Sequence, residues 1–61
     1  MKTLQEYGNY RLLDVSNKQI TKYEIYKTDE MGGKIICSDD DLDAVELVFN
    51  QLKEEEENDV T

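Results

Sequence analysis

Residues 38–54 read SDDDLDAVELVFNQLKE, and this stretch has the clearest structural signal in the chain. Ser38 is a suitable helix N-cap, and Asp41 stands three residues later, as a capping box requires. Cys37 before the cap and Leu42 after it have the spacing of a hydrophobic staple. Apolar residues then recur at helical spacing and form one stripe: Leu42, Val45, Val48, Phe49 and Leu52. The pattern predicts a helix over residues 39–54.

The apolar pattern stops after Lys53, and four consecutive glutamates follow. Negative charge is unfavourable at the C-terminal end of a helix, because the helix dipole is itself negative there. We therefore expect a single domain over residues 1–54 and an acidic, frayed or disordered tail over residues 55–61.

Three runs before the helix are rich in strand-forming residues: 10–15, 20–28 and 34–37. The short polar or glycine-containing loops between them favour an antiparallel meander. Thr3, Glu6 and Gly8 are spaced as the cap, the capping-box acid and the stop of one short N-terminal helical turn. The predicted fold class is α+β, a three-stranded antiparallel meander with one C-terminal helix packed on one face.

Alternation along the strands predicts which side chains meet the helix. We expect the helix-facing set to be Leu13, Val15, Tyr23, Ile25 and Ile35. The opposite face is then predicted to be partly bare, with Tyr10, Leu12, Tyr26 and Ile36 lying on it.

The chemical inventory argues against an enzyme. A chain of 61 residues is at most one small domain, it contains no histidine, and its single cysteine is Cys37. The usual general base is therefore missing, and one thiolate cannot hold a metal alone. Asp39, Asp41 and Asp43 have the alternate spacing of a calcium loop, but the later glycine and glutamate that such a loop needs are absent. We expect no catalytic residue, no metal site and no cofactor.

Charge is distributed very unevenly along the chain. The net charge is −8, yet residues 1–38 carry six basic and five acidic side chains, while residues 39–61 carry ten acids and only Lys53. Such an acidic segment repels phosphates and anionic lipids, which argues against direct binding of nucleic acid or membranes. The lone cysteine and the lack of a signal-like apolar N-terminus predict a cytoplasmic protein, in the host cytosol if a phage encodes it.

Two surfaces are candidates for binding another protein. The first is the acidic side of the helix, where carboxylates one turn apart imitate a short run of phosphates for a nucleic-acid-binding protein. Its predicted partner-binding residues are Asp39, Asp40, Asp41, Asp43, Glu46 and Glu54 for charge, with Leu47 and Tyr26 as apolar anchors. Alternatively, the acids only keep the protein soluble, and the bare sheet face serves a homodimer or a subunit contact.

The layout resembles a known class of proteins. The resemblance is carried by the hairpin from Lys22–Lys27 to Lys34–Cys37, followed directly by the acidic run Ser38–Asp41. In this respect the chain is similar to the small acidic inhibitors of bacteriophages and mobile elements, including anti-CRISPR proteins and the DNA-mimic inhibitors of uracil-DNA glycosylase. The resemblance rests on style and topology, and it implies steric or electrostatic blocking of a host nucleic-acid enzyme.

Overall fold

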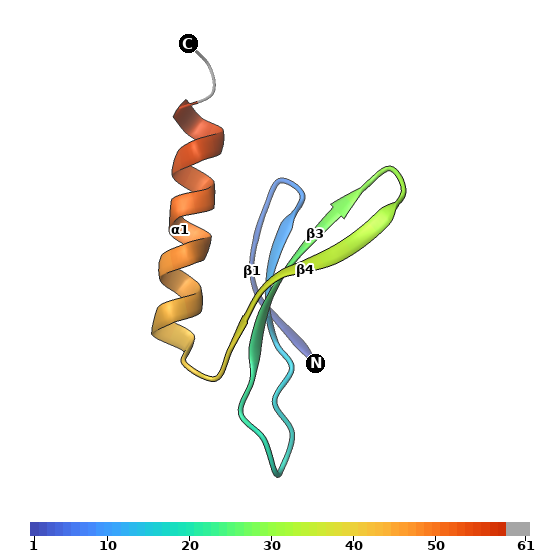
Figure 1. The fold of residues 1–61 in the computed structure, drawn as a ribbon, viewed down its shortest axis with the longest axis vertical. Helices are drawn as coiled ribbons and strands as arrows, with labels where there is room; N and C mark the ends of the chain where they lie inside the picture. The colour runs from blue at the N-terminus through green and yellow to red at the C-terminus, as the bar shows by residue number, and fades with distance from the viewer. Residues whose placement is uncertain (59–61) are drawn as a thin grey trace.

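A computed structural model describes residues 1–58, which form four strands followed by one helix. The elements are β1 (Lys2–Tyr7), β2 (Tyr10–Asp14), β3 (Tyr23–Asp29), β4 (Gly32–Asp39) and α1 (Leu42–Asn58). The strands pair antiparallel in chain order, and α1 lies along one face of the sheet, as Figure 1 shows. The α+β meander with a C-terminal helix is therefore confirmed, but the sheet has four strands instead of the predicted three.

The additional strand is β1, which occupies the residues predicted to form a helical turn. It pairs with β2 through a two-residue connection in which Gly8 adopts a φ of +58°. Glycine at the first central position is typical of a type II′ hairpin turn, so Gly8-Asn9 is itself a hairpin signal. A strand is favoured over one helical turn because Leu4 and Tyr7 pack against the core, whereas an isolated turn would gain little.

The core lies between α1 and the facing side of the sheet. Leu12 of β2 lies opposite Ile25 of β3, and Ile25 lies opposite Cys37 of β4. From the helix, Val45 and Phe49 reach the same layer. Four side chains are almost completely buried there, with at most 1% of their surface exposed: Leu12, Ile25, Val45 and Phe49. Tyr23, Leu42, Val48 and Leu52 border this core.

The predicted facing of β2 is wrong. Tyr10 and Leu12 belong to the helix-facing core, while Leu13 is buried separately from that core, on the other side of the sheet. Leu12 and Leu13 are adjacent and equally apolar, so alternation alone does not decide which one points inward. Pairing with Ile25 decides it, because a strand shifted by one residue reverses every side chain.

A bulge in β4 overturns the prediction for Ile35. Cys37 is paired with Ile25, but Ile35 is paired with Tyr26, so one extra residue, Ile36, interrupts the alternation. Ile35 consequently lies on the face away from the helix and is 53% exposed. Tyr26, which was predicted for that face, does lie on it.

The helix begins later than predicted. Ser38 and Asp39 still pair with Glu24 and Tyr23 in the sheet, so they are held extended and Ser38 is not the N-cap. Asp41 is the cap instead. Its Oδ1 accepts a hydrogen bond from the backbone N–H of Asp43 at 3.0 Å, and its carbonyl oxygen accepts one from Val45 at 3.2 Å.

The helix also ends later than predicted. Residues 55–58 continue α1 without a break, so the predicted end at residue 54 is wrong. The rest of the predicted tail, residues 59–61, lies outside the described residues. Neither in length nor in hydropathy does any helix within residues 1–58 qualify as a membrane-spanning segment.

The corrected cap gives a direct test of the helix start. Asp41→Ala removes the acceptor of the Asp43 N–H and is expected to lower the free energy of unfolding by about 1 kcal/mol. Ser38→Ala, at the position that the sequence suggested, is expected to change it by less than about 0.5 kcal/mol. Urea denaturation of the two variants measures both values. A larger loss for Ser38→Ala would contradict the observed cap.

Candidate functional site

The predicted acidic residues lie at the start of α1 and along its outer side. Asp39 is exposed at the end of β4, Asp40 and Asp41 are exposed in the connection to the helix, and Asp43 and Glu54 are exposed on the helix itself. Glu46 is half-buried. Leu47 is 61% exposed, as the helical spacing predicted. We call the exposed carboxylates of residues 39–43 and 54–57 the acidic helix surface.

This surface is not one continuous row of charge. Asp43 and Glu54 are separated by eleven helical positions, which corresponds to roughly 16 Å along the axis. Between them the exposed side chains are uncharged: Leu47, Asn50 and Gln51. The carboxylates therefore form two clusters, one at each end of the helix, with an apolar side chain between them.

Few positive charges offset these carboxylates. The two ion pairs within residues 1–58 are Arg11 with Glu6 at 3.7 Å and Lys22 with Glu24 at 3.5 Å, and neither involves a residue of α1. The ammonium of Lys53, the one basic side chain of α1, lies 5.6 Å from the centre of the Phe49 ring. It thus faces an aromatic side chain that is itself buried in the core.

Hydrogen bonding favours the ionised form of Asp39. The backbone N–H of Asp41 donates to Oδ1 of Asp39 at 3.1 Å and lowers the pKa of the Asp39 carboxyl, and hydrogen bonding with the Asp40 side chain lowers it further. A group that accepts such bonds is stabilised in its charged form. Asp39 therefore carries its negative charge at neutral pH.

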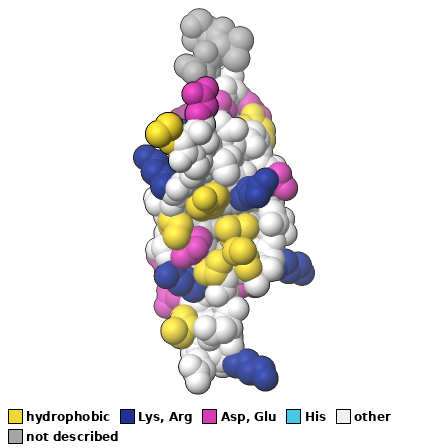
Figure 2. All heavy atoms as spheres, turned by 90° about the vertical axis from the view of Figure 1, so that its right-hand side faces the viewer, with side chains coloured by type: hydrophobic (Ala, Val, Ile, Leu, Met, Phe, Trp, Pro, Cys, Tyr) yellow, Lys and Arg dark blue, Asp and Glu magenta, His cyan; other side chains and the backbone are white. Residues whose placement is uncertain are grey.

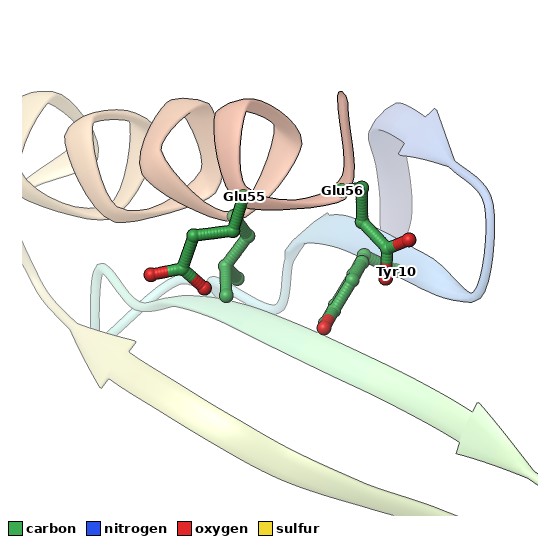
Figure 3. Close-up of a pocket in the computed structure, with 4 residues that line it drawn as sticks. Tyr10, Glu55 and Glu56 are labelled. Atoms are coloured by element: carbon green, nitrogen blue, oxygen red, sulfur yellow. The ribbon is translucent and has the colours of Figure 1, made fainter. Parts of the chain in front are cut away.

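A polar hollow of about 280 Å³ lies where the last turns of α1 pass over β2. It is lined by Tyr10, Leu52, Glu55 and Glu56. Figure 3 shows Glu56 beside Tyr10, while the Glu55 carboxylate points away from the tyrosine. The ammonium of Lys27 lies 5.5 Å from the centre of the Tyr10 ring. Sequence reasoning missed this hollow, because it assigned Glu55 and Glu56 to a tail and Tyr10 to the bare face. Two carboxylates of the C-terminal cluster, Glu55 and Glu56, therefore lie on the side of the helix that faces the sheet.

The other candidate surface is the face of the sheet that α1 leaves uncovered. A shallow depression of about 310 Å³ lies on it, and we call its lining the open sheet face: Met1, Thr3, Arg11, Leu13, Glu24, Tyr26 and Ile35. Figure 2 views the molecule from this side and shows hydrophobic side chains gathered at the centre among charged ones. Of these residues only Tyr26 was predicted to bind a partner.

Tyr26 and the acids do not form one site. Tyr26 lies on the open sheet face, while the helix that carries the acids packs on the opposite side of the sheet. The sequence therefore predicted one binding site from residues that the fold places on opposite sides of the sheet. If Gly8-Asn9 had been recognised as a hairpin turn, the sequence would have predicted the fourth strand. The pairing of that strand with β2 places Thr3 next to Leu13 on this face.

Tyr26 is held in place by the glycine beside it. A Cβ at Gly33 would overlap with the Tyr26 ring, so the aromatic side chain lies directly over the Gly33 backbone. Gly33 has no left-handed φ, which makes space the only reason for a glycine here. The close approach fixes where the Tyr26 ring sits on the open sheet face.

The remaining chemistry of the described residues is sparse. Cys37 is half-buried against the core, and no histidine stands anywhere in the chain to activate it. Across residues 1–58, no group of three or more metal-binding side chains is arranged to hold an ion. What the two surfaces can provide is charge, one exposed leucine, and a mixed apolar depression.

Comparison with known protein families, with curated proteins and with solved structures found no match to this chain.

The contact between Tyr26 and Gly33 can be tested by a double-mutant cycle. Gly33→Ala forces the Tyr26 ring to move and is expected to destabilise the protein by about 1 kcal/mol. In a Tyr26→Ala background the same change should be neutral or slightly stabilising, because alanine is better than glycine in a strand. Denaturation of the four proteins gives the coupling energy. An equal loss in both backgrounds would show that the ring does not cover Gly33.

Proposed function

We propose that this protein is a non-enzymatic inhibitor or regulator that binds a basic surface on a nucleic-acid-binding protein. The observation that supports this most is the acidic helix surface: clusters of exposed carboxylates lie at the two ends of α1, and the exposed Leu47 lies between them on the outer side. A basic groove or patch that normally contacts phosphates would receive these carboxylates in their place.

The distribution of charge on α1 favours a binding surface over a surface that serves only solubility. Solubility of a small domain is achieved with both signs of charge interspersed and a modest net charge. In α1 the acids are instead concentrated at the two ends, and its one lysine lies against Phe49. Unpaired charges of one sign steer a complementary partner and raise its association rate.

The arrangement also specifies what the partner surface should look like. It should carry two basic patches roughly 16 Å apart, the distance between Asp43 and Glu54 along the helix. Between them it should offer an apolar spot for Leu47, because a desolvated apolar contact supplies affinity that exposed ion pairs do not. Blocking such a surface by DNA mimicry is what the resemblance to phage inhibitors implies. A partner of this kind also fits a cytoplasmic setting.

The test begins with capture of binding proteins from the producing cell by the immobilised protein. We expect captured proteins that bind nucleic acid, that are released by added salt, and that double-stranded DNA displaces. Asp43→Asn with Glu46→Gln, and separately Glu54→Gln with Glu57→Gln, should each weaken binding about ten-fold at low salt, since two charge contacts at the protein surface are worth roughly 1.4 kcal/mol.

The matched control is Asp29→Asn with Glu30→Gln, which removes the same charge from the exposed tip of the β3–β4 hairpin. Asparagine keeps the oxygen that accepts the N–H of Met31, so the turn is preserved. We expect this pair to change binding less than about two-fold. An equal effect of all three pairs, or a complex that salt leaves intact, would contradict binding through the helix.

A further inference from the structure

The open sheet face differs in charge from the rest of the molecule. Its charged lining residues, Arg11 and Glu24, are each joined to a partner of opposite sign, Glu6 at 3.7 Å and Lys22 at 3.5 Å. These four groups cancel formally, although the whole chain carries −8. The side-chain charges of this face are therefore balanced, on a strongly acidic protein.

The centre of this face is apolar and incompletely covered. Leu13 is only 9% exposed and lies apart from the helix-facing core, so it has a small apolar layer of its own. The depression over it is lined by the half-buried Tyr26, by Ile35 at 53% exposure and by Met1 at 92%. Burial of Ile35 and Met1 would remove further apolar surface from water, which is the main favourable term in protein association.

A domain of this size would gain stability by burying more apolar surface than it does alone. Six apolar side chains are buried within residues 1–58: Tyr10, Leu12, Leu13, Ile25, Val45 and Phe49. Chains of about 60 residues bury about 60% of the surface that the unfolded chain exposes, a smaller share than larger domains bury, and some gain stability from a disulfide, a metal or oligomerisation. A disulfide within the chain is impossible, because the sequence has a single cysteine. Residues 1–58 hold no cluster of side chains arranged to bind a metal ion, so of these three routes association is the one that the described residues offer.

We propose that the open sheet face is a homodimer interface, which packs against the same face of a second copy. A two-fold contact brings identical surfaces together, so it requires a surface that does not repel itself. The neutral open sheet face meets this requirement, and the acidic helix surface does not. The result is a sandwich of two sheets with one helix on each outer side.

This arrangement also separates the acidic surfaces of the two copies. Packed sheets lie about 10 Å apart, and a helix packs at a similar distance from its own sheet, which puts the two helices roughly 30 Å apart. That separation is several times the Debye length of about 8 Å at physiological ionic strength. The remaining repulsion is screened by salt, so the dimer is expected to become tighter as salt is raised. This inference does not depend on the proposed function, whose complex should weaken with salt.

Sedimentation equilibrium over a wide range of protein concentrations tests the interface. We expect the wild type to be a dimer whose dissociation constant falls with added salt. Ile35→Glu should weaken the dimer by at least about ten-fold, because a two-fold interface contains each substitution twice. Ile35→Lys should act in the same direction, which shows that the loss comes from apolar contact and not from the sign of the charge. Circular dichroism establishes that both variants are folded.

Leu47→Glu is the matched control, since Leu47 is equally apolar and 61% exposed but lies on the acidic helix surface. It should leave the dimer unchanged while weakening capture of the proposed partner. A wild type that is monomeric at every concentration would overturn the homodimer. So would a dimer that Leu47→Glu disrupts and both Ile35 variants leave intact. A monomeric wild type would leave the proposed function standing, and loss of partner capture alone would leave the dimer standing.

Discussion

Leu12 and Ile25 lie side by side at the centre of the sheet, and the Val45 and Phe49 side chains of α1 cover them. All four are at most 1% exposed, so this contact is the most completely dehydrated part of the protein. Because one helix can cover only one side of a four-stranded sheet, burying this layer leaves the other side open. The positions of both candidate surfaces follow from that constraint.

The same contact orients the acids. With Val45 and Phe49 directed at the sheet, Asp43, Leu47 and Glu54 fall on the outer side of α1 and are exposed. Six of the seven basic side chains precede the helix, and two of them, Arg11 and Lys22, are paired with glutamates. The molecule therefore has an acidic side and a neutral side, with the sheet between them. The two proposed contacts would therefore not compete for the same surface.

Local features of the fold were predictable because they depend on residues close in the sequence. The stripe of Leu42, Val45, Phe49 and Leu52 repeats at helical spacing, so the helix and its buried side could be read directly. The exposure of Leu47 followed from the same spacing. Errors arose where two local signals competed. Thr3 and Glu6 suggested a cap, while Gly8-Asn9 marked a hairpin, and the pairing of β1 with β2 decided in favour of the strand.

For the candidate sites, composition alone showed that acids are concentrated within residues 39–57 and that the charges of residues 1–38 nearly balance. It also showed that the chain has no histidine. Long-range pairing decided which residues share a surface. Leu12 points inward and Leu13 outward because of the register with Ile25, and the bulge at Ile36 turns Ile35 to the open face. The physical reason is the two-residue period of a strand, since a shift of one position reverses every side chain and only the pairing partner fixes that shift.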